Sequence, residues 1–277
     1  GVFTVGVFMA FLAYKSQFES RIGSLINHFV EVKMLSLHGE RLADIVLTET
    51  ESERTPDTGI PNLEGGIEIR LENVSFRYAE NEPYVLKDVN LTVKAGESLA
   101  LTGRSGCGKS TLLDVLCGNL KPESGKVLVN GHDIYRLPPR FIRSLGAVVR
   151  QNDVLFAGSI ADNIGFFDET PNRDKIEQCA QMAMIHEEIM AMPMGYETLI
   201  GDMGSALSGG QKQRIVLARA LYQNPKILFL DEATSHLDIA NEKAVNEHLK
   251  NLPFTKIMAA HRKETVESAD RIFDLAT

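Results

Sequence analysis

The first 48 residues have the hydrophobic pattern of one long helix. Residues 2–14 are almost wholly apolar (VFTVGVFMAFLAY), and large apolar residues then recur mostly at three- and four-residue steps as far as Val32. The apolar run is shorter than the roughly 20 residues that a membrane span needs. The pattern alone fits a core helix of a soluble protein and a membrane helix that continues into the cytoplasm equally well.

A polar, acidic stretch separates this helix from the rest of the chain. Residues 49–66 read ETESERTPDTGIPNLEGG and contain two prolines and a pair of glycines, a composition typical of a linker. We therefore expect a helical segment at 1–48, a linker at 49–66 and a folded domain at 67–277.

Beyond the linker, short apolar runs alternate with helical patterns. Ile67, Ile69 and Leu71 alternate with polar residues, as in a strand with one buried face. Further strands are predicted at 90–93, 98–102, 126–129, 147–149, 227–230, 256–260 and 271–275. Helices are predicted at 109–120, 173–192, 209–223 and 239–252. Strands that alternate with helices indicate an α/β domain with a largely parallel core sheet.

Composition and charge narrow the functional classes. The chain has 277 residues, 44% of them hydrophobic and 24% charged, which suits a folded domain rather than a disordered one. Its net charge of -8 argues against a nucleic-acid partner. The three cysteines are an odd number without metal-ligand spacing, so we expect reduced thiols.

A glycine-rich loop indicates phosphate binding. The segment 103–110 reads GRSGCGKS, which fits G-x-x-x-x-G-K-[ST], follows a predicted strand and opens a predicted helix. Glycines let the backbone wrap around phosphate oxygens, and the helix N-terminus supplies positive charge. Lys109 reaches the β- and γ-phosphates and the Ser110 hydroxyl can ligate Mg²⁺. The expected phosphate contacts are Gly103, Arg104, Ser105, Gly106, Cys107, Gly108, Lys109, Ser110 and Thr111.

Two carboxylates follow a second apolar strand. Residues 227–232 read ILFLDE, so Asp231 and Glu232 stand at the carboxyl end of a buried strand, where ligands bind in open α/β sheets. Asp231 is placed to hold Mg²⁺, and Glu232 is the expected general base for an attacking water. In isolation, the alternative would be a solvated acidic turn.

A third motif makes a family resemblance visible. Residues 207–211 read LSGGQ before a predicted helix, which is a second glycine-rich helix N-terminus suited to a phosphate. Here the chain resembles the ABC transporter ATPases, whose signature is LSGGQ. The resemblance implies a head-to-tail homodimer in which each ATP lies between the phosphate loop of one copy and Ser208, Gly209, Gly210 and Gln211 of the other.

The same resemblance assigns further site residues. Tyr78 matches the aromatic residue that stacks on adenine, and Gln151 matches the glutamine that contacts Mg²⁺ and the attacking water. Residues 235–238 (SHLD) match the D-loop, with a histidine where alanine is more usual. His261 matches the switch histidine, so that Glu232, His261 and Lys109 would be the catalytic residues. The implied metal ligands are Ser110, Gln151 and Asp231.

The implied fold is a P-loop NTPase of ABC type. It has a parallel core sheet, an antiparallel β subdomain and a helical subdomain, and here a long, partly transmembrane helix would precede it. In single-chain exporters the last transmembrane helix runs directly into the cytoplasm, which favours the membrane interpretation of residues 1–48.

Several segments resemble exporters in particular. Residues 151–164 (QNDVLFAGSIADNI) look like the exporter segment near the membrane-domain docking surface. Residues 192–205 (MPMGYETLIGDMGS) and 35–45 (LSLHGERLADI) look like colicin V-type bacteriocin exporters, which carry a leader peptidase domain. The resemblance implies peptide export across the bacterial inner membrane, with the ATPase on the cytoplasmic side and the membrane domain as partner.

Three alternatives remain at this point. The first is a lipid or drug exporter ATPase of the same fold, because the cargo is chosen by membrane segments mostly outside this sequence. The second is a regulatory module that binds ATP without turnover, against which the intact Glu232 and His261 argue. The third, a soluble ABC ATPase of DNA repair or translation, is disfavoured by the apolar N-terminus.

Overall fold

The structure is a computed structural model that describes residues 4–48, 65–201, 207–233, 239–260 and 262–275. By its internal contacts the chain divides into two compact units, Gly1–Ser52 and Glu53–Thr277. Each unit is described by itself.

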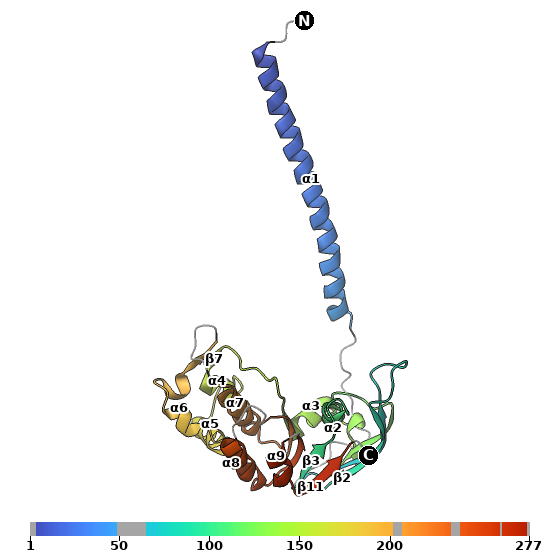
Figure 1. The fold of residues 1–277 in the computed structure, drawn as a ribbon, viewed down its shortest axis with the longest axis vertical. Coiled ribbons are helices and arrows are strands. Elements are labelled where there is room, and N and C mark those ends of the chain that lie inside the picture. The colour runs from blue at the N-terminus through green and yellow to red at the C-terminus, as the bar shows by residue number, and fades with distance from the viewer. Residues whose placement is uncertain (1–3, 49–64, 202–206, 234–238, 261, 276–277) are drawn as a thin grey trace. The chain divides into compact units, whose positions relative to one another are not determined.

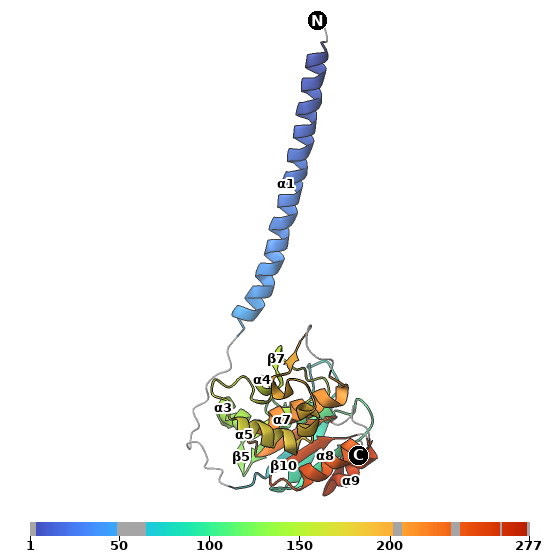
Figure 2. The ribbon, with the colours of Figure 1, turned by 90° about the vertical axis from the view of Figure 1, so that its left-hand side faces the viewer.

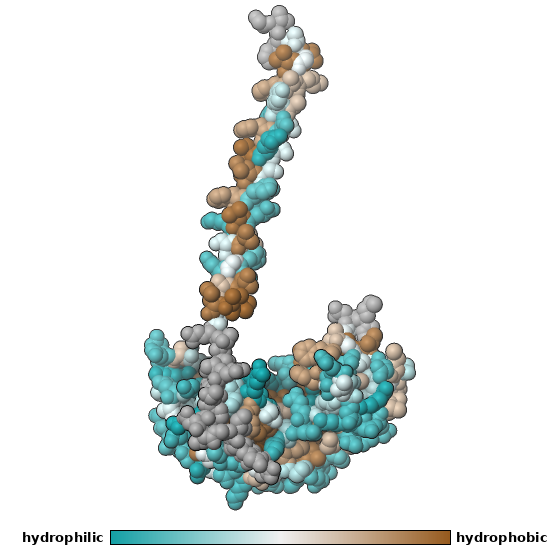
Figure 3. Space-filling view, turned by 180° about the vertical axis from the view of Figure 1, so that it is seen from behind, coloured by the Kyte–Doolittle hydropathy of each residue, from teal (hydrophilic) through white to brown (hydrophobic). Residues whose placement is uncertain are grey.

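A single helix, α1 (Val5–Val46), makes up most of the first unit (Figure 1). Its large apolar side chains are exposed, among them Leu25 (67%) and Phe29 (69%), and Figure 3 shows hydrophobic side chains along its length. The predicted helix is confirmed. Part of it was expected to be transmembrane; within the described ranges, no helix combines the length and the hydropathy that crossing a bilayer requires.

The second unit is built on a five-stranded parallel sheet. Its strand order is β11-β3-β10-β9-β6, and every neighbouring pair is parallel. These strands are β3 (Ser98–Thr102), β6 (Gly146–Val149), β9 (Ile227–Asp231), β10 (Thr255–Ala259) and β11 (Arg271–Asp274). The predicted α/β architecture with a parallel core is confirmed.

A separate antiparallel sheet has the order β2-β1-β4-β5. Its strands are β1 (Ile69–Phe76), β2 (Leu86–Val93), β4 (Ser124–Val129) and β5 (His132–Asp133). A short third pair joins β7 (Gly158–Ser159) to β8 (Leu199–Ile200). The antiparallel part of the expected fold is therefore confirmed.

The parallel sheet is buried on both faces. In β9, Ile227 and Phe229 pack into one hydrophobic cluster with the antiparallel sheet, whereas Leu228 and Leu230 pack into another with the helices. Because successive side chains of a strand point to opposite faces, a four-residue apolar run serves two cores at once.

The helices cover these cores. After β3 comes α2 (Lys109–Leu116), while α4 (Ile160–Ile164), α5 (Arg173–Met182) and α7 (Gly209–Tyr222) pack together as the helical part (Figure 2). The remaining helices are α3 (Pro139–Leu145), α6 (His186–Met190), α8 (Ile239–Lys250), α9 (Lys263–Ser268) and the 3-10 turns η1 (Ile134–Arg136) and η2 (Gly195–Glu197).

Two predicted helices are wrong in extent. The helix expected at 173–192 is two helices, α5 and α6, because Met184 takes a left-handed φ of 56° between them. The helix expected at 109–120 ends at Leu116, and Gly118 follows with φ 77°. The Val115 carbonyl at that helix end accepts from the Gly118 N–H at 3.1 Å, so it is paired although the helix does not continue.

Candidate functional site

Four neighbouring strands of the parallel sheet end at one edge. Ala259 of β10 is in register with Leu101 of β3 on one side and with Asp231 of β9 on the other. In turn β6 pairs with β9, with Val149 opposite Leu230. The segments that leave these strands are the phosphate loop, the turn with Gln151, the Asp231–Glu232 pair and the residues after Ala260. The structure thus brings the predicted phosphate loop, Gln151, Asp231 and Glu232 to one sheet edge, while His261 lies outside the described residues.

The phosphate loop depends on its glycines. Gly103, Gly106 and Gly108 have φ of 140°, 80° and 100°, a region that side-chain-bearing residues rarely adopt. A Cβ at Gly108 would also lie 2.9 Å from Val85 Cγ1 and 3.2 Å from the Val85 carbonyl oxygen. Strain and crowding together require glycine where α2 begins.

Lys109 folds back over this loop. Its ammonium donates to the carbonyl oxygens of Gly103 at 3.1 Å and Arg104 at 3.2 Å, and the residue is 6% exposed. The neighbouring Ser110 is exposed on the first turn of α2. A cation and a helix N-terminus beside left-handed glycines form a group of donors that suits phosphate.

Tyr78 lies beside the same helix. Its hydroxyl is 2.9 Å from Thr111 Oγ1, and its ring meets Phe76 edge-on at a centroid distance of 5.0 Å. The residue is 59% exposed, so its ring is available for stacking. The preceding residue, Arg77, is fixed by a two-point contact with Glu123, with both N–O distances 2.7 Å. The predicted adenine residue is therefore next to the phosphate loop.

The carboxylate pair lies at the end of β9. Asp231 and Glu232 are half-buried, and Glu232 has a left-handed φ of 51° with its N–H donated to the Ala259 carbonyl at 3.2 Å. Non-glycine residues in this conformation are held by their surroundings, here by the backbone of the neighbouring strand.

Sequence reasoning missed a polar group next to Glu232. A pocket of about 160 Å³ is lined by Glu232 and by four further polar residues, Glu242, Asn246, Arg262 and Thr265. Glu242 is 0% exposed, with its Oε2 2.7 Å from Arg262 Nη1, and its Oε1 accepts from the Thr265 hydroxyl at 2.5 Å. In the sequence, the position of Arg262 directly after His261 was the feature that could have pointed to this polar group.

The glycine-rich signature lies elsewhere in the unit. Ser208 is the N-cap of α7: its Oγ accepts the Gln211 N–H at 3.2 Å, and Gln211 Oε1 accepts the Ser208 N–H at 2.9 Å. This helix belongs to the helical part with α4 and α5, apart from α2 (Figure 1). Within one chain, the signature residues lie away from the phosphate-loop edge; these are Ser208, Gly209, Gly210 and Gln211. The predicted head-to-tail dimer requires this separation, because the signature of one copy would meet the phosphate loop of the other. The predicted D-loop at 235–238 lies outside the described residues.

Comparisons with known proteins agree with this geometry. The sequence profile of the ABC transporter family matches residues 86–235. The chain is 46% identical to a probable microcin-H47 secretion/processing ATP-binding protein and 45% identical to a colicin V secretion/processing ATP-binding protein, both of Escherichia coli. Each match covers 98% of this chain, which spans 39% of the length of each relative. The solved structure of a bacterial Atm1-family ABC exporter with ATP bound superposes with a TM-score of 0.77 at 31% identity, covering 88% of this chain and 42% of that one.

Proposed function

The chain belongs to the ABC transporter family, and we propose that it is the ATP-binding and hydrolysing part of an exporter. The observation that supports this most is the shared edge of β3, β10, β9 and β6. It gathers the phosphate loop and two carboxylates in a single chain, and Tyr78 lies beside the helix that follows the loop.

Each residue at this edge has a proposed role. Lys109 and the loop N–H groups bear the phosphate charge, and Glu232, with His261, orients and deprotonates the attacking water. Tyr78 stacks on adenine. Positioning and charge stabilisation are the main demands of phosphoryl transfer. The paired strands would position these residues, and Lys109 with the loop N–H groups would stabilise the charge.

Magnesium fits the oxygen ligands at this edge. The hydroxyl of Ser110, the amide oxygen of Gln151 and the carboxylate of Asp231 are the hard oxygen donors that Mg²⁺ prefers. Together they would hold it, and the bound ion would neutralise charge on the phosphates.

We further propose that the working unit is a homodimer. Ser208, Gly209, Gly210 and Gln211 would meet the γ-phosphate of ATP held by the partner copy, because their own phosphate loop lies in another part of the chain. ATP binding would close two composite sites, and hydrolysis would reopen them.

The proposed cargo is a bacteriocin-like peptide. This rests on the secretion/processing proteins that the chain matches over 98% of its length. Residues 1–48 would be the end of the exporter's membrane domain, 49–66 a linker and 67–277 the ATPase, on the cytoplasmic side of the bacterial inner membrane. The exposed apolar side chains of α1 would then pack against the other membrane-domain helices. A lipid or drug exporter ATPase is the alternative cargo assignment, and a transport assay on the full-length protein separates the two.

The first experiment measures ATP hydrolysis by the full-length protein beside its Glu232→Gln variant. We expect turnover in the parent, whereas the variant should bind ATP, lose most turnover and accumulate as a closed dimer. A parent that binds ATP without hydrolysing it would favour a regulatory module instead. Parental turnover in the variant would show that Glu232 is not the base.

A further inference from the structure

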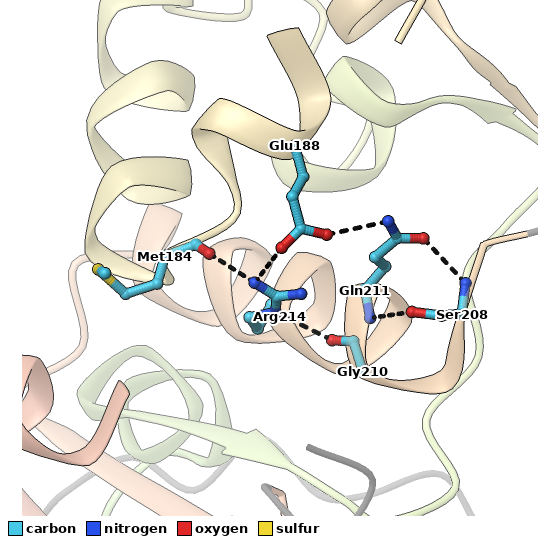
Figure 4. Close-up of polar contacts among 6 residues, drawn as sticks. All are labelled: Met184, Glu188, Ser208, Gly210, Gln211 and Arg214. Atoms are coloured by element: carbon cyan, nitrogen blue, oxygen red, sulfur yellow. Dashed lines mark hydrogen bonds and ion pairs between the residues drawn. The ribbon is translucent and has the colours of Figure 1, made fainter. Parts of the chain in front are cut away.

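A polar cluster connects α6 to the N-terminus of α7. Glu188 on α6 uses both carboxylate oxygens: Oε2 accepts from Gln211 Nε2 at 2.9 Å, and Oε1 lies 2.7 Å from Arg214 Nη1 (Figure 4). Gln211 in turn accepts from the Ser208 N–H. A carboxylate on one helix is thus one hydrogen bond away from the signature cap on the next.

The cation in this cluster is deeply placed. The Arg214 side chain is 5% exposed, against 40% for Glu188. Arg214 also donates to the carbonyl oxygens of Met184 at 2.7 Å and Gly210 at 3.3 Å. It therefore ties the turn between α5 and α6 to a signature glycine, and it fixes where the Glu188 carboxylate can sit.

Glu188 determines which way the Gln211 amide faces. An ionised carboxylate only accepts hydrogen bonds, so Gln211 must turn its NH₂ group towards Glu188. Its oxygen then faces the Ser208 N–H, the one orientation that completes the capping box. With the amide reversed, an NH₂ group would face an N–H donor.

The cap in turn sets the direction of the Ser208 hydroxyl. Its oxygen accepts the Gln211 N–H, so its own proton points away from that contact and can be donated outwards. Hydroxyl and backbone donors at a helix N-terminus are suited to a phosphate oxygen.

We propose that Glu188 is a positioning residue for the signature: it fixes the Gln211 amide and so aims Ser208 at the γ-phosphate of ATP held by a second copy of this chain. The inference rests on the proposed function. Since ADP lacks the γ-phosphate, Glu188 should affect ATP turnover and ATP-driven dimer closure without affecting ADP binding.

The test is the Glu188→Gln variant of the full-length protein. A glutamine side chain here has one acceptor oxygen for two facing donors, so one donor must face an NH₂ group. We expect about a tenfold loss of kcat/KM for ATP, equivalent to one charge-assisted hydrogen bond. The ADP affinity should stay close to that of the parent. The melting temperature should fall by only about 2–4 °C, because the glutamine oxygen can still accept from the buried Arg214. Glu187→Gln is the matched control: it removes the same charge from an exposed neighbour on α6 and should stay within about twofold of the parent.

A double variant that exchanges the residue types at 188 and 211 tests the proposed direction of the hydrogen bonds. Gln211→Glu alone sets two carboxylates against each other and should be the more damaging single change. Combined with Glu188→Gln, the carboxylate at 211 accepts from the Ser208 N–H, while the amide at 188 donates to it and accepts from Arg214. We expect the double variant to hydrolyse ATP at least several-fold faster than Gln211→Glu alone.

The outcomes separate this inference from the proposed function. An active parent with an unchanged Glu188→Gln variant would overturn the inference alone, as would a parallel fall in ADP affinity or an exchange variant without recovery. A parent that binds ATP but does not hydrolyse it would overturn the proposed function and, with it, the basis of the inference.

Discussion

Replacing Arg262 with methionine should destabilise the second unit through the buried charge of Glu242. The Glu242 side chain is 0% exposed, and Arg262 Nη1 lies 2.7 Å from its Oε2. Arg262→Met keeps a long apolar side chain and removes the cation. The carboxylate then stays buried without that partner, a situation that proteins tolerate poorly.

The size of the destabilisation follows from the exposed fractions of the Glu242 and Arg262 side chains. Removing one partner of a buried ion pair costs about 3–5 kcal/mol. The lower end applies here for two reasons. Arg262 is 40% exposed, so water can reach the position that its guanidinium vacates in the variant. The Thr265 hydroxyl also still donates to Glu242 at 2.5 Å. A loss of about 3 kcal/mol corresponds to a fall in melting temperature of roughly 6–12 °C for a domain of this size.

Scanning calorimetry of the chain measures this loss, with two control variants. Lys263→Met removes a neighbouring cation whose contact with Glu267 is exposed, with side-chain exposures of 83% and 64%, and should cost at most about 0.5 kcal/mol. Adding Glu242→Gln to Arg262→Met removes the buried charge, so the double variant should be the more stable of the two. The reasoning fails if the double variant is no more stable than Arg262→Met, or if Arg262→Met melts like Lys263→Met.

Two further predictions concern thiols and acid stability. Burial raises the pKa of the Cys117 thiol far above its usual range and that of Cys179 to about 11. Cys107 and Cys117 are both half-buried, but Cys107 lies in the phosphate loop. N-ethylmaleimide should therefore modify Cys107 first, and more slowly with ATP present; mass spectrometry that finds equal labelling of Cys117 would contradict this. The hydrogen bond from Arg77 holds the pKa of Glu123 below its usual 4.5, so this carboxylate stabilises the fold above that pH and the contribution is lost as the pH falls through the lower folded value. Glu123→Gln should lower the melting temperature near neutral pH, with a gap to the parent that closes in acid; a gap that does not change with pH would show that the ion pair is not its source.

Local patterns in the sequence predicted the parts of the site that local geometry builds. The phosphate loop occupies one strand–turn–helix, so the spacing of its glycines and of Lys109 was enough to place it. The four apolar residues before Asp231 predicted a buried strand, and in the structure β9 serves two cores.

The polar clusters could not be predicted in the same way. Glu188 meets Gln211 across 23 residues, and Glu242 meets Arg262 across 20. In the sequence alone, each of these charges looks like a solvated surface residue, and the contacts form only when the fold brings distant segments together. The packing of α8 on α9 leaves Glu242 fully buried. The break at Met184 was missed for a related reason. Neither glycine nor proline marks it, and the carbonyl of Met184 is held by Arg214 from another helix.

The two halves of the proposed composite site are held by different kinds of contact, which has consequences for mutation. The phosphate loop leaves β3, which has backbone-paired neighbours on both sides, β10 and β11. A single side-chain change near it, away from the glycines and Lys109, leaves that pairing intact. The signature is aimed instead by side chains, through Gln211, Glu188 and Arg214, on the five-residue helix α6 and the first turns of α7. Because no backbone ladder replaces a lost side-chain contact there, conservative changes such as Glu188→Gln should reduce turnover more than comparable changes on β3. The same dependence on side chains would let the signature be re-aimed at little cost when the proposed dimer opens and closes.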